Sequence, residues 1–143
     1  MNNERLHINY LKRRWAQEEA VRDKLEERAR RMFLEQEANQ LFLPIENYLT
    51  RLSEVLSAVG GSVQVDVNWE HLGDQKLRRL AKVRFSESGQ QLALDFTIEG
   101  ASIFYCDKRY PFLGGMKALL AVLTSDLEPF FTSQPTQAVE SGS

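Results

Sequence analysis

Residues 62–106 decide the fold and read SVQVDVNWEHLGDQKLRRLAKVRFSESGQQLALDFTIEGASIFYC. Apolar and polar residues alternate there in four short runs, and a period of two is typical of a strand with one buried and one wet face. The runs cover residues 63–69, 81–86, 92–98 and 101–106. Short connections containing glycine follow the second and third runs, so the pattern predicts a four-stranded antiparallel β-meander.

The turn at Glu99 and Gly100 sets the predicted register of the last two strands. If these residues form a two-residue hairpin loop, with Gly100 supplying a positive φ, three inner-face pairs follow. They are Ile98 with Ala101, Phe96 with Ile103, and Leu94 with Tyr105. The same count turns Phe104 and Cys106 to the outer face, where we expect them to contact a partner.

The second run is less regular than the others. Its alternation is blurred at residues 77–80, which predicts a bulge or a late strand start near Leu80. Counting through the turn at Gly89 places Lys82 near Asp95, and such a cross-strand ion pair supports the register.

A basic cluster on this run is the most suggestive charged feature of the chain, and its members are Lys76, Arg78, Arg79, Lys82 and Arg84. A basic strand beside an outward aromatic side chain is a surface that binds single-stranded nucleic acid. The candidate nucleic-acid site therefore comprises Arg78, Arg79, Lys82, Arg84 and Phe104. Carboxylates on the flanking strands oppose that field, so ordinary cross-strand pairing is the competing interpretation.

The stretch from about Glu4 to Gln40 predicts one long helix. It contains no Pro or Gly and is rich in Ala, Glu, Gln, Arg, Lys and Leu, which are strong helix formers. Such a helix extends about 55 Å, which is longer than a small domain is wide. We therefore expect it to project from the domain or to pack against another chain.

A heptad seam follows one side of this helix through Ile8, Leu11, Trp15, Leu25, Ala29 and Met32, with Phe33 beside it. Glu18 and Arg22 interrupt the seam and leave two apolar patches, so a two-stranded coiled coil is allowed but not required. A solvated helix whose ends touch the rest of the fold is the alternative. The predicted partner-binding residues are Leu25, Ala29, Met32, Phe33, Phe104 and Cys106.

The remaining helices are placed by prolines and glycines. Leu43 and Pro44 predict a kink or short linker, because proline disfavours the α conformation in the residue before it. Amphipathic helices are expected at 45–59, ending at Gly60, and at 115–128, ending at Pro129. The predicted organisation is a helical stalk at 1–40, an α+β domain at 41–131 with both helices on one face of the sheet, and a disordered tail at 132–143.

Composition excludes several classes of protein. A hydrophobic content of 43% and a charged content of 27% are ordinary for a globular chain, and the net charge of −2 gives no overall basic field,. Cys106 is the single cysteine, so we expect no disulfide framework, no thiolate metal site and a reducing cytoplasm,. The N-terminus lacks the apolar core of a secretory signal, and no run is long enough to span a bilayer.

No residue pattern in the chain indicates catalysis, a metal ion or a cofactor. His7 and His71 have no other ligand at motif spacing, and a lone half-buried thiol is usually a small hydrophobe,. The leading hypothesis is a non-enzymatic adaptor or assembly module that acts as a homodimer and binds protein partners. A single-stranded nucleic-acid-binding protein is the alternative.

Overall fold

The computed structural model describes residues 2–86 and 89–132. Its elements follow in the order α1 (Asn2–Ser57), β1 (Ser62–Val65), β2 (Glu70–His71), β3 (Lys76–Arg84), β4 (Gln91–Glu99), β5 (Ser102–Tyr105), β6 (Lys108–Pro111) and α2 (Phe112–Thr132). The chain divides into two compact units between Glu37 and Ala38. Residues 133–143 of the predicted tail lie outside the described residues.

The first unit is helical along its described length, as the sequence predicts. Oppositely charged side chains four residues apart bind each other on its surface. The Arg14 side chain donates to Glu18 over 3.4 Å, and the Arg31 side chain donates to Glu27 over 3.1 Å. Exposed pairs of this kind contribute about 0.2–0.5 kcal/mol each to a helix.

The second unit contains an antiparallel sheet with the strand order β1-β3-β4-β5-β6, and β2 also pairs with β3. The predicted α+β class and meander are confirmed, but the sheet has six strands instead of four. The run at 63–69 is interrupted, since β1 ends at Val65 and pairing resumes only at β2, and Val67 between them is 86% exposed. From the sequence, residues 107–112 are too short a stretch and too marked by Pro111 for a central strand and are expected to form a turn and an edge segment. Lys108–Pro111 within this stretch form the sixth strand, β6.

The predicted register of the β4–β5 hairpin is wrong by one turn position. Glu99 pairs with Ser102, Phe96 pairs with Tyr105, and the turn residues are therefore Gly100 and Ala101. Gly100 has φ +59°, and a two-residue turn with a positive φ at its first central position suits glycine there. Because the shift along the partner strand is two residues, the faces stay as predicted and Phe104 points outward beside Thr97.

The second predicted run starts earlier than expected and has no bulge. β3 pairs with β4 without interruption from Lys76 to Arg84, and its burial alternates along the whole strand. The alternation looked blurred because Arg79 occupies a buried position on the inner face. Lys82 lies opposite Ala93, so Asp95 takes Arg78 as its ionic partner instead of Lys82.

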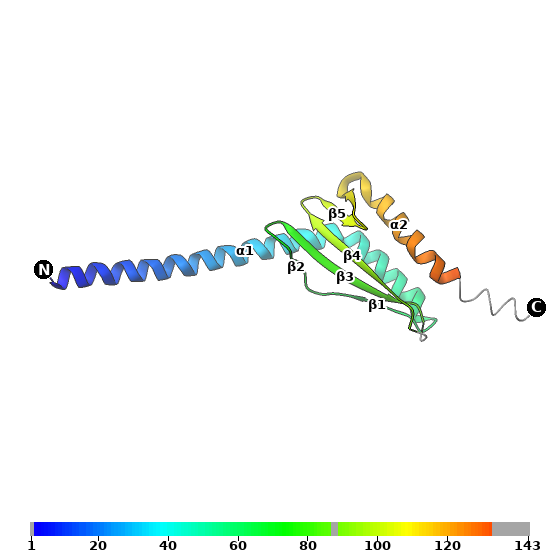
Figure 1. Ribbon diagram of the computed structural model, residues 1–143, viewed down its shortest axis with the longest axis horizontal. Coiled ribbons are helices and arrows are strands. Elements are labelled where there is room, and N and C mark those ends of the chain that lie inside the picture. The colour runs from blue at the N-terminus through cyan, green and yellow to red at the C-terminus, as the bar shows by residue number, and fades with distance from the viewer. Residues whose placement is uncertain (1, 87–88, 133–143) are drawn as a thin grey trace, which may run out of the picture. The chain divides into compact units, whose positions relative to one another are not determined.

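The part of α1 that belongs to the second unit, residues 38–57, and helix α2 cover the inner face of the sheet (Figure 1). In the second unit, Phe42 of α1 contacts Phe96 of β4 edge to face, and Tyr105 of β5 donates a hydrogen bond to Asp126 of α2. The two helices also meet directly, where the hydroxyl groups of Tyr48 and Thr124 lie 2.8 Å apart. This confirms the predicted helix pair on one side and leaves the opposite, outer face of the sheet to other contacts.

The two prolines do not break the helices as predicted. α1 continues through Pro44, so the linker expected there is wrong. A proline inside a helix costs about 3 kcal/mol, and Phe42, Ile45 and Leu49 on either side are essentially fully buried, which offsets that cost. α2 likewise continues past Pro129.

The end of α2 holds two aromatic side chains against the core. Phe130 stacks on the buried Phe85 ring at 4.4 Å, and Phe131 meets the same ring edge to face at 5.7 Å. Ring pairs of this kind contribute beyond their buried area. They explain why the helix keeps its geometry after the proline instead of turning back.

Candidate functional site

The helix of residues 5–37 exposes its apolar side chains to an unusual degree. In the second predicted patch, Leu25, Met32 and Phe33 are 59%, 55% and 58% exposed, and Ala29 is exposed as well. In the first patch, Ile8, Leu11 and Trp15 are at least half exposed. The structure therefore leaves the whole predicted seam accessible to a partner.

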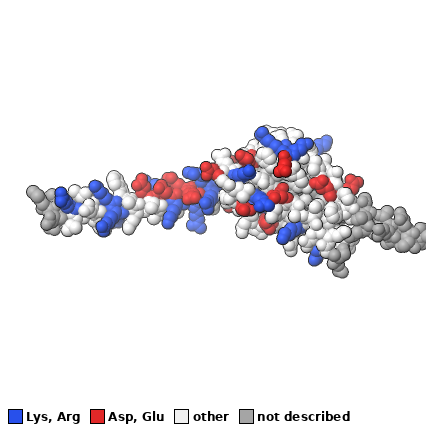
Figure 2. Space-filling view, viewed as in Figure 1, with Lys and Arg blue, Asp and Glu red and all other residues white. Residues whose placement is uncertain are grey.

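These patches share one side of the helix. At 100° per residue, the seam residues fall within about a third of the circumference. Glu18 and Arg22 lie on the same side between the two patches, and both are exposed. On the face of the helix seen in Figure 2, charged side chains of both signs stand among uncharged ones, and Leu6, Tyr10 and Val21 are exposed outside the seam. In coiled coils, apolar residues at heptad spacing are the positions through which two helices pack.

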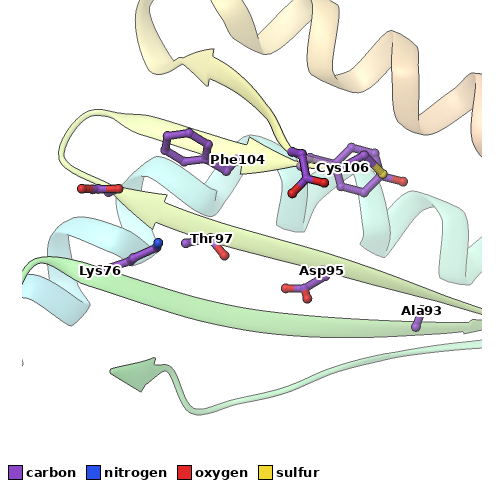
Figure 3. Close-up of a pocket in the computed structure, with 9 residues that line it drawn as sticks. Lys76, Ala93, Asp95, Thr97, Phe104 and Cys106 are labelled. Atoms are coloured by element: carbon purple, nitrogen blue, oxygen red, sulfur yellow. The ribbon is translucent and has the colours of Figure 1, made fainter. Parts of the chain in front are cut away.

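The outer face of the sheet forms the second candidate surface. A depression of about 390 Å³ lies on it around Phe104 (Figure 3). It is lined by Lys76, Ala93, Asp95, Thr97, Glu99, Phe104, Tyr105, Cys106 and Asp107. Phe104 is half-buried and Cys106 is exposed, so two of the predicted partner-binding residues share this depression.

Positive φ angles shape one end of the depression. Cys106 has φ +50° and Asp107 has φ +62°, and they connect β5 to β6 as a two-residue turn. Two consecutive positive values are those of the type I′ hairpin turn, which usually contains Asn and Gly. The thiol of Cys106 therefore stands on a tight hairpin turn, where the sequence pattern placed the end of a strand.

An ion cluster occupies the middle of the outer face. Arg78 donates to both carboxylate oxygens of Asp95 over 2.7–3.1 Å, and Glu70 lies 3.6 Å from its guanidinium. The hydrogen bonds that Arg78 donates to Asp95, together with the negative charge of that carboxylate, raise the pKa of Arg78 above its ordinary value. Two carboxylates thus already bind the most central cation of this face.

The structure separates the predicted nucleic-acid residues. Arg79 is only 7% exposed and lies on the inner face, because it alternates with Arg78 along β3. Lys82 and Arg84 are exposed on the outer face. Phe104 lies in register with Thr97 and through it with Arg78, so Lys82 is about 13 Å farther along the strand.

Several residues of the depression were not among the sequence-predicted site residues. Thr97, Glu99 and Asp107 line it, and Arg109 pairs across the strands with Phe104 while its side chain donates to Ser102 over 2.8 Å. The alternation of β4 already put Thr97 and Glu99 on the wet face. The sequence indicates an edge segment after Cys106 but not its register, and the pairing of that segment with β5 brings Arg109 beside Phe104.

Comparison with known proteins gives no match to a family model, to a curated protein or to a solved structure. Within the described part of the chain, no three His, Cys, Asp or Glu side chains are grouped so that they could hold a metal ion. Neither helix that the structure describes combines the length and apolar character needed to cross a bilayer. The candidate sites consequently depend on their own geometry alone.

Proposed function

We propose that this chain is a non-enzymatic interaction module that forms a homodimer through the helix of residues 5–37. The observation that carries the proposal is the exposure of both apolar patches on that helix. Leu25, Met32 and Trp15 are each more than half exposed. Burying one side chain of this size contributes about 1.5–3 kcal/mol, so a second chain covering these residues gains considerable free energy.

The outer face of the sheet supplies the surface for a protein partner of the dimer. Phe104 is an aromatic side chain at a depression lined by both apolar and charged groups, and aromatic residues are enriched where protein interfaces are most strongly stabilised. Cys106 lies at the same depression. Because Cys106 is the single cysteine of the chain, a reducing compartment is favoured, and we propose that the module acts in the cytoplasm. Imaging of a fluorescently tagged chain tests this location.

The geometry gives the nucleic-acid alternative less support. Of its basic residues, Arg79 is buried and Arg78 is bound to two carboxylates. Lys82 and Arg84 are accessible but lie away from Phe104. Labelled single strands titrated at low salt test this alternative, and binding that weakens steeply with added salt would favour it over protein contact.

A charge placed in the second apolar patch tests the dimer. The variant Leu25→Glu should raise the dimer dissociation constant at least about 100-fold, because each of the two chains loses a buried leucine. Light scattering after size-exclusion chromatography measures the change in mass. Glutamate is a good helix former, so the loss would not come from the helix itself.

Ala20→Glu is the matched control, because Ala20 is exposed on the opposite side of the helix. It adds the same charge and permits a favourable pair with Lys24 four residues later. The mass should stay that of the natural chain. If Ala20→Glu dissociates the chains as strongly as Leu25→Glu, or if neither changes the mass, the apolar patches are not the contact surface.

A further inference from the structure

We propose that the two copies of the helix at residues 5–37 pair in an antiparallel orientation, with the two-fold axis passing near Ala20. This inference rests on the proposed homodimer and specifies its geometry. The helix seam is defined here as residues 8, 11, 15, 18, 22, 25, 29 and 32, spaced alternately by three and four. All of these side chains are exposed.

The spacing of the seam positions is symmetrical about residue 20. If one helix is reversed about Ala20, each seam residue faces the residue of the other chain that lies equally far from position 20 on the opposite side. The numbers of the two facing residues then add up to 40. Trp15 then faces Leu25, and the largest seam residue packs on a flexible aliphatic side chain. Leu11 faces Ala29 in the next layer, which pairs a large side chain with a small one as interdigitated packing requires.

The charged residues at the centre decide between the two orientations. In the antiparallel arrangement Glu18 of each chain faces Arg22 of the other, so two opposite-charge pairs flank the axis. In a parallel dimer at the same register, Glu18 would face Glu18 and Arg22 would face Arg22. Like charges placed opposite each other in a partly dehydrated seam are strongly unfavourable. The residues that interrupt the apolar seam therefore complement a reversed second copy.

Charged side chains beside the seam favour the parallel orientation, but only weakly. In a parallel pair, Arg14 of one chain would approach Glu19 of the other. In the chain itself Arg14 already donates to Glu18 over 3.4 Å, with both side chains more than half exposed. Exposed pairs remain hydrated and are screened by salt. The seam positions lose more water on pairing, so they dominate the choice of orientation.

Distances between spin labels on the two chains test this orientation. The full-length chain carries Cys106→Ser, so that the exposed native thiol takes no label, together with either Glu37→Cys or Ala20→Cys. Light scattering first checks that each labelled chain keeps the mass of the natural one. Both label positions are exposed on the helix, and pulsed electron paramagnetic resonance measures the distance between chains.

The antiparallel pair predicts a separation of about 51 Å between the two backbones at residue 37, which lies 17 residues from the axis. A parallel pair predicts roughly 10 Å there. Residue 20 lies level with its copy in both arrangements, and because it points away from the other chain, the two backbones there are about 15 Å apart. A long distance at 37 with a short one at 20 supports the proposal. Short distances at both positions overturn the orientation but keep the dimer, and no distance between chains at either position overturns both.

Discussion

The guanidinium carbon of Arg79 lies 4.0 Å from the centre of the Trp69 ring. The same cation approaches the Phe42 ring at 5.2 Å and donates hydrogen bonds to the Val67 carbonyl and to Asn39. Trp69 donates to that Asn39 oxygen as well, over 2.8 Å. Arg79 therefore joins strand β3 to the irregular segment before β2 and to helix α1.

Replacing this arginine should destabilise the fold more than any other change in the basic cluster. Arg79→Ala removes the contact with two aromatic rings and the hydrogen bonds to Val67 and Asn39, so we expect a loss of about 2–4 kcal/mol in the free energy of unfolding. Urea denaturation measures it. The exposed Lys82→Ala is the control and should stay within about 0.5 kcal/mol. Equal losses would contradict the buried role of Arg79.

Tyr105 should make the fold sensitive to alkaline pH. Burial, together with the hydrogen bond to Asp126, raises the pKa of Tyr105 above its ordinary value of 10.0. The folded chain therefore holds the phenol proton at pH values where the unfolded chain has released it. Its stabilising contribution is complete below about pH 10 and is lost as the pH rises above it.

The variant Tyr105→Phe separates this effect from other alkaline changes. At neutral pH it should lose about 1–3 kcal/mol, because the half-buried carboxylate of Asp126 loses its donor. Above pH 10 the gap between the natural chain and the variant should narrow. Thermal melts between pH 7 and 11 measure both. A gap that widens with pH would contradict the sign of this linkage.

Gly61 and Gly73 form a matched pair for testing close packing. A Cβ at Gly61 would lie 2.5 Å from the carbonyl oxygen of Arg84, whereas a Cβ at Gly73 meets nothing within 4 Å. We expect Gly61→Ala to destabilise the fold by about 1–3 kcal/mol, since backbone atoms must move apart. Gly73→Ala should be neutral or stabilising by about 0.4–1 kcal/mol. Chemical denaturation of both variants checks the contrast.

Phe104 and Phe96 should respond differently to truncation, because they lie on opposite faces. Phe96 is fully buried, so Phe96→Ala should cost about 3–5 kcal/mol. Phe104 is half-buried at the outer depression, and Phe104→Ala should cost about 1 kcal/mol or less. Differential scanning calorimetry compares them. Comparable losses would place Phe104 in the core and remove it as a partner contact.

The faces of the sheet could be predicted from the sequence, but the register could not. A period of two fixes which residues share a face, and shifting the β4–β5 turn from Glu99-Gly100 to Gly100-Ala101 leaves that assignment unchanged. Glycine can occupy either central position of a two-residue turn, and the pattern does not distinguish them. Phe104 was therefore placed on the correct face opposite the wrong neighbour.

Individual tertiary contacts account for the other errors. Arg79 was grouped with the surface cations because an arginine on an inner face looks like an interrupted alternation until Trp69 and Phe42 are seen around it. Pro44 has a local preference that ends helices, but the buried residues beside it override that preference. Local propensity is a weak guide where long-range packing is strong.

The candidate surfaces were predictable to different extents. The exposed seam of the first helix follows directly from helical spacing, because no other part of the fold rearranges it. The depression at Phe104 depends on the turn at Cys106 and Asp107, and neither of these residues is the glycine that usually indicates a two-residue turn. The exposure of the helix patches could therefore be predicted from the sequence, whereas the depression could be predicted only in part, and the binding role of both stays a prediction.

Sedimentation equilibrium of the unmodified full-length chain tests the central claim most directly. Each chain has a mass of 16.5 kDa, and the exposed patches at Trp15, Leu25 and Met32 are expected to be covered by a second copy. At tens of micromolar the account predicts a mass near twice that of one chain, falling toward the single-chain value on dilution. A mass of 16.5 kDa at every concentration in that range would contradict it.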